Sequence, residues 1–364
     1  MSRPLPFFAM IAIAIGAAAT ASAGPVSLSD AQRQKLIQLV KSDTEAGQQF
    51  AEIKREADAA LKAEPNPIHH IRSEGKLSSD PERIQTQKST PDLKKMYALG
   101  FAYAVTGDAA YPAKARSILK AWAKVNESRG DPIDDTGLEQ AIVAYDLVRA
   151  TCSTEEKRAI DEWLRKTADA EMATARKKSS TTRNNWHSHR LKIVGLVGLL
   201  LDDKKLTDWT VGAFKEQIDQ NLYADGSSYD FHERDALHYH CYDLEPLLTL
   251  AIAAGQAHID LYSHTSKEGA SIAKSVRFVV QYCDGSKTHA EFVNSKVSFD
   301  KKRADSGDAH YKAGTLFEPK NGRHTLELAA YFDPSLMPLV CKLSGKAERF
   351  PTWQTVLNAV RRHP

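Results

Sequence analysis

The sequence lacks the features that mark several common classes of protein. Its four cysteines lie far apart and form no Cys-x-x-Cys pair, which gives a structural zinc site little support. The formal net charge is only +3, with 26% charged residues of both signs, so charge does not indicate a nucleic-acid partner. A basic rim around a cleft would instead suit an acidic polymer. Beyond the N-terminus, no segment approaches the run of about 18 apolar residues that spans a membrane.

The cysteines leave the disulfide pattern open. An exported protein can form disulfides, and Cys283 with Cys341 is one conceivable pair. Buried free thiols are the alternative for all four residues, which are Cys152, Cys241, Cys283 and Cys341.

The N-terminus has the pattern of a secretory signal peptide. Arg3 precedes an apolar stretch from Leu5 to Ala19, and small residues at 21–23 suit a signal peptidase. We therefore expect residues 1–23 to be removed, and the remaining residues 24–364 to form one domain in the periplasm or the medium, without membrane insertion.

Apolar residues recur at intervals of three and four along most of the remaining chain, which is the period of an amphipathic helix. The predicted helices span residues 29–62, 91–106, 111–126, 136–150, 154–176, 185–201, 205–221, 235–254, 257–282 and 322–333. Helix pairs joined by short turns predict an all-α fold, an α/α toroid built as an incomplete (α/α)6-type barrel of helical hairpins. A few short strands are expected between residues 285 and 320, where the helical period is lost.

Two polar stretches are longer than a connection between helices requires. Residues 65–90 contain three prolines and many charges, which suits a lid or a cleft loop. Residues 223–235, YADGSSYDFHERD, combine turn residues with aromatic and charged ones just ahead of a helix. Loops of this kind often carry function.

The first cluster of candidate site residues is RNNWHSHRLK, residues 183–192, which leads into an apolar helix. Either Asn184 or Asn185 can cap that helix, which leaves the other amide unexplained. Asn185 and His189 are four residues apart and share one helix face, whereas His187 points elsewhere. Each histidine alone is also compatible with a structural role. An amide and an imidazole together at a helix N-terminus favour an anionic ligand.

The second cluster is HERDALHYHCYDLEPL. In helical register Asp235, Tyr239 and Tyr242 lie near one face, with His238 beside Tyr242. A lone tyrosine here would be a core residue with a bonded hydroxyl, but so many histidines and tyrosines together indicate a site. No metal is expected, because His238 and His240 diverge by about 200° on a helix.

Together these segments resemble the alginate lyase superfamily, best known from polysaccharide lyase family 5. That family has an Asn-Asn-His motif on one inner helix and an Arg-Ala-Leu-x-Tyr-His-x-Tyr motif on another, to which RNNWHSHRLK and DGSSYDFHERDALHYHCYDLEPL are similar. SEGKLSSDPERI, residues 73–84, resembles the lid-loop segment, and ALGFAYAVTGDAAYPAKARSILKAW, residues 98–122, resembles a helical segment. The likeness spans most of residues 65–255, and the α/α toroid of the family agrees with the helical pattern.

The chain departs from the family motifs at two points. Trp186 falls where the family has its histidine, which leaves His187 and His189 as displaced candidates. Asp235 occupies the arginine position, with Arg234 one residue earlier. These departures indicate a divergent branch.

The resemblance implies a lyase that cleaves a polyuronate by β-elimination, in which the C5 proton is abstracted, the C4 oxygen leaves and a 4,5-unsaturated product forms. Tyr242 matches the catalytic tyrosine, which acts as base and then as acid, and Tyr239 with His240 matches the Tyr-His pair before it. The ordinary tyrosine pKa near 10 must fall for this role, and Arg234 or a protonated histidine nearby would lower that pKa.

The carboxylate beside C5 must be neutralised before the proton can leave. The candidates are Asn185, Arg234 and one of His187 or His189, with His189 preferred from helix geometry. In mannuronate and glucuronate the C5 hydrogen and the C4 oxygen lie on the same side, so one tyrosine can serve both. In guluronate they lie on opposite sides, and a second group such as histidine must act. Alginate, as polymannuronate, is the first expected substrate, with glucuronan as a further possibility.

Further residues are candidates for binding the polymer, by ion pairing or by stacking of an aromatic ring on a sugar. They are Arg72, Lys76, Arg83, Asn184, Trp186, Arg190, Lys192, His238, Tyr239 and His240. Singly, each charged one is also compatible with a solvated surface role. We expect an acidic polysaccharide as the partner, and no cofactor, metal ion or nucleic acid.

Two other functions are compatible with the sequence. A glycoside hydrolase on an α/α toroid would use two carboxylates, for which Asp134, Asp135, Glu139, Asp225, Asp230, Glu233 and Asp235 are candidates. A noncatalytic periplasmic protein that binds a polyuronate would keep the basic and aromatic lining, but it would tolerate phenylalanine at position 242.

Overall fold

The structure is a computed structural model, which describes residues 25–175, 180–345 and 348–362. The predicted signal peptide, residues 1–23, lies outside the described residues. Within them the chain is mostly helical, and β pairing is limited to two isolated bridges, Leu222 with Ser228 and Ala290 with Leu316. The all-α prediction is confirmed. Over these described ranges we find no helix that is long and apolar enough to cross a membrane.

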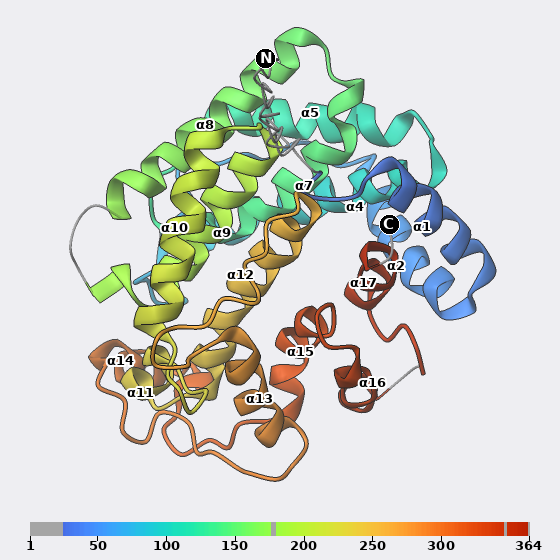
Figure 1. Ribbon diagram of the computed structural model, residues 1–364. Helices are drawn as coiled ribbons and strands as arrows, with labels where there is room; N and C mark the ends of the chain where they lie inside the picture. Colours follow the sequence, from blue (N-terminus) through green and yellow to red (C-terminus); the bar gives the residue numbers. More distant parts are fainter. Residues whose placement is uncertain (1–24, 176–179, 346–347, 363–364) are drawn as a thin grey trace, which may run out of the picture.

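The helices form an α/α toroid, with an inner ring of helices and further helices packed outside it (Figure 1). Contacts run around the ring in chain order, and the last helix returns to the second, which closes the ring. The inner ring consists of α2 (Thr44–Ala60), α4 (Pro91–Thr106), α7 (Glu139–Val148), α9 (Asn185–Leu200), α12 (Leu237–Gln256), α15 (Arg323–Ala329) and α17 (Trp353–Arg361). Outside it pack α1 (Asp30–Ser42), α5 (Ala110–Val125), α8 (Thr154–Ala175), α10 (Lys204–Asn221) and α13 (Ile272–Cys283).

Local sequence explains where the central helices begin and end. Asn184 caps α9, because its side-chain oxygen accepts a hydrogen bond from the Trp186 amide at 3.1 Å. Asn185 is therefore the amide left free for another role. Asp203 caps α10 in the same way, and α4 ends at Gly107, whose positive φ of 73° reverses the chain at no steric cost.

Two of the predicted helices are each broken by an aspartate. The segment 29–62 forms α1 and α2, because Asp43 ends the first helix and its carboxylate caps the second. The segment 235–254 begins instead with Asp235 in the left-handed conformation, φ 48°, between α11 (Tyr229–Arg234) and α12. A left-handed residue cannot continue a right-handed helix. The expectation that Asp235 shares a helix face with Tyr239 and Tyr242 is therefore wrong.

The prediction fails most between residues 257 and 320. The helix predicted over 257–282 begins only at Ile272, after turns at His258 (φ 59°) and Gly269 (φ 85°). The strands expected between 285 and 320 do not form in the described chain, which instead contains α14 (Ser298–Asp305) and a short 3-10 turn, η4 (Ala309–Tyr311). The other α-helices that the period did not reveal are all short. They are α3 (Pro81–Ser89), α6 (Pro132–Asp135), α11, α16 (Met337–Ser344) and α17.

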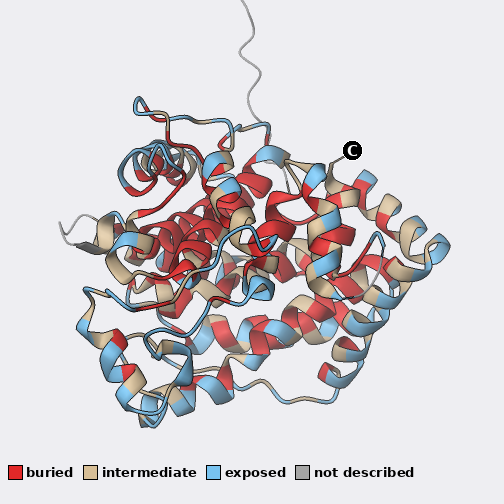
Figure 2. Ribbon diagram, turned by 90° about the horizontal axis from the view of Figure 1, so that it is seen from below, coloured by how far each residue is buried: buried red, intermediate tan, exposed pale blue. Residues whose placement is uncertain are grey.

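Helix α9 lies at the centre of the fold and is buried from His187 to Leu200. Figure 2 shows buried residues concentrated in the central helices. A Cβ at Gly195 would lie 2.5 Å from Leu250 of α12 and 2.8 Å from Thr210 of α10, so glycine allows both helices to approach closely. Because α9 is enclosed on these sides, its polar residues must find their partners inside the protein.

All four cysteines are free thiols, so the conceivable pair of Cys283 with Cys341 is not formed. Cys283 is buried, and burial raises the pKa of its thiol to about 12. A thiol that stays protonated is a poor nucleophile, which fits a packing role.

Candidate functional site

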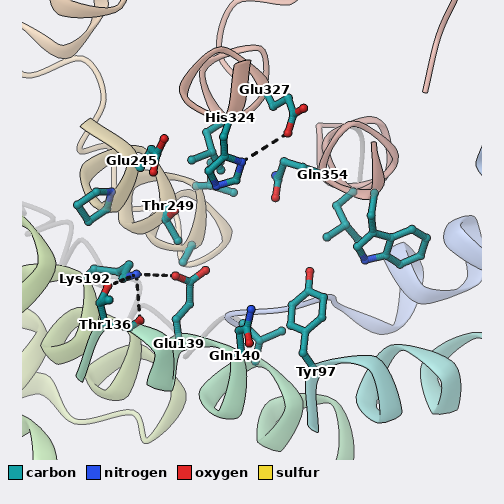
Figure 3. Close-up of a pocket in the computed structure, with 18 of the residues that line it drawn as sticks. Tyr97, Thr136, Glu139, Gln140, Lys192, Glu245, Thr249, His324, Glu327 and Gln354 are labelled. Atoms are coloured by element: carbon teal, nitrogen blue, oxygen red, sulfur yellow. Dashed lines mark hydrogen bonds and ion pairs between the residues drawn. The ribbon is translucent and has the colours of Figure 1, made fainter. Parts of the chain in front are cut away.

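Two cavities meet at Tyr242, whose side chain lines both of them. The inner cavity, of about 510 Å³, is the lumen of the toroid and is lined by the inner-ring helices (Figure 3). The outer groove, of about 180 Å³, lies at the N-terminal ends of α9 and α12. It is lined by Ser73, Glu74, Arg83, Ile133, Asn185, Trp186, Arg234, His238, Tyr239, Tyr242, Arg303, Asp308 and Tyr311.

The outer groove brings together the two motifs that the sequence suggested. Helices α9 and α12 pack against each other, so that Asn185 and Trp186 from one face the same groove as Tyr239 and Tyr242 from the other. The Asn185 amide and the Tyr242 phenol therefore line one groove.

Asn185 is buried and held in one orientation by Asp230. Its backbone amide donates to the Asp230 carboxylate at 2.8 Å, and its side-chain amide donates to the other carboxylate oxygen. Asn221 donates to the same carboxylate at 2.9 Å. Burial raises the pKa of Asp230 to about 6, and the hydrogen bonds from the two asparagines oppose that rise. An amide held in this way is preorganised to donate its second N–H to a ligand.

The structure places His189, and not His187, beside Tyr242. The rings of His189 and Tyr242 are 4.2 Å apart, and His189 Nδ1 is 2.7 Å from the Thr136 hydroxyl. His187 lies instead near Arg190 and Trp209, and it lines neither cavity. Burial lowers the pKa of His189 well below its ordinary value, and Lys192 lowers it further. His189 is therefore neutral at neutral pH.

Two arginines line the outer groove. Arg234 pairs with Asp300 and lies 3.9 Å above the ring of Tyr239. Arg303 donates to the Tyr239 hydroxyl at 3.0 Å and lies 3.6 Å from the Glu74 carboxylate. Each guanidinium group already pairs with one carboxylate, but an arginine has five N–H donors, and those left over suit an anionic sugar.

Sequence reasoning missed the contribution of α14 and η4. Arg303, Asp308 and Tyr311 all line the groove, yet they come from the segment where strands were expected. The Tyr311 hydroxyl lies 3.2 Å from that of Tyr239. This segment has no helical period and no family motif, so only the folded chain reveals that it completes the site.

The expected lowering of the pKa of Tyr242 does not occur in the empty site. Burial raises that pKa above the ordinary value, and the carboxylates of Glu74 and Glu245 raise it further. Arg234 lies over Tyr239 instead, and His189 carries no charge, so neither acts as the expected cation. Ionisation of Tyr242 therefore depends on what enters the groove.

The polar loop 65–90 reaches the groove through Ser73 and Glu74. The buried carboxylate of Asp134 accepts hydrogen bonds from both backbone amides, at 2.6 and 2.9 Å, and from the Ser73 hydroxyl at 2.9 Å. This aspartate therefore fixes the turn that carries Glu74 into the site.

The cations of this loop are divided between the groove and the surface. Arg83 lines the groove and donates to the Lys76 carbonyl at 2.9 Å. Arg72 and Lys76 pair with Glu82 and line neither cavity. We therefore retain Arg83 in the proposed site and leave the other two cations out.

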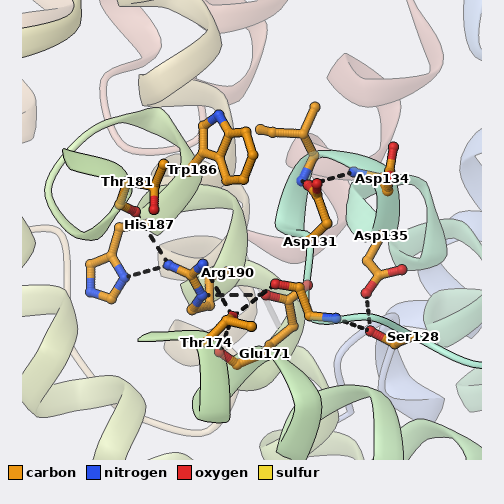
Figure 4. Close-up of polar contacts among 12 residues, drawn as sticks. Ser128, Asp131, Asp134, Asp135, Glu171, Thr174, Thr181, Trp186, His187 and Arg190 are labelled. Carbon is orange, nitrogen blue, oxygen red and sulfur yellow. Dashed lines mark hydrogen bonds and ion pairs between the residues drawn. The ribbon is translucent and has the colours of Figure 1, made fainter. Parts of the chain in front are cut away.

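Several other predicted binding residues lie away from the groove. Arg190 is buried in an ion pair with Glu171, 3.3 Å away, and its neighbours are His187 and Thr174 (Figure 4). His240 is buried between the Ser228 hydroxyl and the Ser275 carbonyl, at 2.8 and 3.2 Å. We leave Arg190 and His240 out of the proposed site because no ligand in either cavity can reach them.

The inner cavity contains paired charges. Lys192 donates to Glu139 at 2.6 Å, and His324 contacts Glu327 at 3.4 Å (Figure 3). Lys192 is therefore not free to bind a carboxylate of the polymer. Among the described residues no group of three or more His, Cys, Asp or Glu side chains is placed to hold a metal ion.

The fold and the groove together define a helical toroid with an amide, a phenol and arginines arranged for an anionic sugar. The sequence profile of the alginate lyase family matches residues 28–289. The chain therefore belongs to the alginate lyase family and is a polysaccharide lyase. A polysaccharide lyase of Stenotrophomonas maltophilia is 28% identical over 306 residues, which cover 73% of this chain and 89% of the relative.

Solved structures share the fold. An alginate lyase from Bacteroides ovatus superposes with a TM-score of 0.68 and 17% identity, covering 92% of this chain and 98% of its own. The alginate lyase from Sphingomonas species A1 superposes with a TM-score of 0.56 and 22% identity, covering 72% and 80%. A tyrosine-to-phenylalanine variant of alginate lyase A1-III, complexed with a tetrasaccharide, gives a TM-score of 0.57 at 21% identity, covering 72% and 78%.

Proposed function

We propose that this protein cleaves a polyuronate by β-elimination, with alginate, as polymannuronate, as the first substrate and glucuronan as the second. The observation that carries the proposal is that Asn185 and Tyr242 face one groove which arginines also line. We propose further that residues 24–364 form the mature domain, exported to the periplasm or the medium by the N-terminal signal. The complex of a related lyase with a tetrasaccharide supports an oligosaccharide in such a groove.

Asn185 and the arginines of the groove neutralise the sugar carboxylate in this proposal. Proton abstraction at C5 places a second negative charge next to that carboxylate, so donors fixed beforehand stabilise the transition state more than the ground state. Asn185 is fixed by Asp230, and Arg234 is fixed by Asp300. His189, being neutral, contributes no charge.

Tyr242 takes the C5 proton and returns it to the C4 oxygen in this proposal. It lies at the junction of the two cavities, so a chain bound in both would pass its hydroxyl. One group can serve as base and acid only where the C5 hydrogen and the C4 oxygen lie on the same side, as in mannuronate and glucuronate units.

The raised pKa of Tyr242 predicts an alkaline pH profile. Since the base must be deprotonated to act and its pKa lies above the ordinary value of about 10, we expect kcat/KM to rise between about pH 7 and about pH 9. Initial rates on polymannuronate at low substrate concentration measure this dependence. A profile that falls across this range would contradict Tyr242 as the base.

We expect the substitution Glu74→Gln to improve substrate binding. The Glu74 carboxylate lies 3.6 Å from Arg303 and raises the pKa of Tyr242, so it competes with the sugar carboxylate for the same cation. Removing its charge should lower KM by about 2-fold to 5-fold, as expected for one partly exposed ion pair. It should also move the rise in the pH profile to lower pH.

The matched control for Glu74→Gln is Glu82→Gln, which makes the same change nearby, in the first turn of α3. Glu82 pairs with Lys76 and lies outside the groove, so this variant should leave KM and the pH profile unchanged. Equal effects of the two substitutions would assign the change to the loop as a whole rather than to the Glu74 carboxylate.

A panel of purified polyuronates tests the function itself. The unsaturated product of elimination absorbs in the ultraviolet, so we expect absorbance to grow with polymannuronate and glucuronan. New reducing ends without absorbance would indicate a glycoside hydrolase. Binding without either signal would indicate a noncatalytic binding protein.

The structure favours the lyase over the hydrolase. A hydrolase needs two free carboxylates across the bond. Asp230 accepts hydrogen bonds from Asn185 and Asn221, and Asp134 holds the loop turn at Ser73. These carboxylates are occupied by structural contacts, whereas Tyr242 faces open space.

A further inference from the structure

The hydrogen bonds behind His189 determine which of its nitrogens carries the proton. The Lys192 ammonium has three N–H donors and no acceptor. They go to the Glu139 carboxylate at 2.6 Å, the Thr136 hydroxyl at 2.9 Å and the Thr136 carbonyl at 3.2 Å (Figure 3). The Thr136 hydroxyl oxygen therefore accepts a hydrogen bond from Lys192.

The single hydroxyl proton of Thr136 then has one partner, His189. Thr136 Oγ1 lies 2.7 Å from His189 Nδ1, and because Lys192 can only donate, Nδ1 is the acceptor for the Thr136 O–H. Nδ1 must therefore be the unprotonated nitrogen, and a neutral imidazole then carries its proton on Nε2.

The protonated nitrogen of His189 is buried. Nε2 makes no well-aligned hydrogen bond among the described residues, and the backbone of Tyr242 is a hydrogen-bonding neighbour of the ring, which raises the pKa of His189 against the larger effect of burial. The side chain lines the inner cavity next to Tyr242, with the two rings 4.2 Å apart. Because Nε2 is inaccessible to solvent, a ligand in the cavity cannot reach it, and the proton on this nitrogen leaves the ring no free lone pair there.

We propose that Thr136 and Lys192 are positioning residues that hold His189 in the tautomer protonated on Nε2, so that its ring has no free lone pair and cannot accept the C5 proton of the substrate. The catalytic consequence of this inference rests on the proposed β-elimination, whereas the assignment of the His189 tautomer does not. A histidine held in this way leaves Tyr242 as the group that both takes and returns the proton. It therefore provides no second base for units whose C5 hydrogen lies on the opposite face.

The substitution Thr136→Val tests this assignment, because it removes the hydroxyl and keeps the shape. We expect kcat on polymannuronate to fall by about 10-fold to 100-fold, the range typical of losing a residue that orients a site group. Thr136→Ser retains the hydroxyl and should restore most of the rate. Thr210→Val makes the same change at a buried threonine that packs on α9 at Gly195, away from both the site and His189, and should leave kcat unchanged.

A direct measurement of the tautomer completes the test. Nuclear magnetic resonance of the full chain with isotope-labelled histidine should show His189 neutral and protonated on Nε2 in the wild type, and a mixture of tautomers in Thr136→Val. A wild-type His189 that is protonated on Nδ1, or doubly protonated, at neutral pH overturns the proposal. So does a Thr136→Ser variant as impaired as Thr136→Val.

The two readouts separate this proposal from the proposed function. If the wild type cleaves no polyuronate but His189 shows the expected tautomer, the β-elimination fails and the assignment of Thr136 and Lys192 stands. If the wild type cleaves polymannuronate and polyguluronate at comparable rates, a second base acts and the role given to His189 is wrong.

Discussion

Replacing Tyr242 by phenylalanine is expected to lower kcat on polymannuronate by about 100-fold to 10,000-fold, the contribution typical of a positioned acid or base. The side chain of Tyr242 lines both cavities, and its ring packs against His189. Phenylalanine keeps that ring contact, so the fold should not change. Product absorbance under saturating substrate, together with thermal unfolding of both proteins, measures the two effects separately.

The matched control is Tyr239→Phe, on the same helix and in the same groove. The Tyr239 hydroxyl accepts from Arg303 and lies close to that of Tyr311, so it is already engaged. Its removal should raise KM by loosening Arg303 and should reduce kcat much less than Tyr242→Phe. If the Tyr242 variant kept wild-type kcat, the protein would be a binder, or another group would be the base.

Replacing Arg190 by methionine is expected to destabilise the protein by about 3–5 kcal/mol, the cost typical of breaking a buried ion pair. Arg190 and its partner Glu171, whose contact Figure 4 shows, are both almost completely inaccessible to solvent. Burial raises the pKa of Glu171 well above its ordinary value, and the neighbouring Asp135 raises it further, while Arg190 opposes both effects. Removing the arginine leaves carboxyl groups buried without a cation. Denaturant unfolding at neutral pH measures the loss.

Two further variants make this prediction specific. Arg165→Met breaks an ion pair with Asp203 in which the arginine is 46% exposed, so its cost should be within about 1 kcal/mol. Adding Glu171→Leu to Arg190→Met should recover much of the stability, because both buried charges are then gone. A loss for Arg190→Met no larger than that for Arg165→Met would show that the buried pair contributes little.

The helices that the sequence predicted well are those with both a long apolar stripe and a terminal signal. α4 has the predicted bounds and ends at Gly107, and α8 has a polar start at Ser153 and a clear helical period. Both signals are local, since a cap or a left-handed glycine depends on a few neighbouring residues. The predicted ends of these helices therefore agree with the structure to within a residue or two.

The sequence predicted the helix boundaries less well where a single residue decides between helix and turn. The periodic pattern continues through Asp235, but its left-handed conformation, held by hydrogen bonds from Asn294 to its carboxylate, ends one helix and starts another. The partner Asn294 belongs to a distant segment, which local reasoning does not reach. Arg303 also comes from a distant segment, and it lines the groove although no sequence motif marks it.

By itself, the sequence determined that the chain is helical and that its helices pair into a toroid, because helical period is a property of short segments. Its resemblance to the alginate lyase superfamily implied that Asn185 and Tyr242 lie together, and both line one groove. Only the tertiary structure decided that His189 rather than His187 meets Tyr242, that Arg190 is buried with Glu171, and that the empty site raises the pKa of the Tyr242 phenol. These outcomes depend on burial and on charges from segments far apart in the chain, and such long-range contacts are absent from any local pattern.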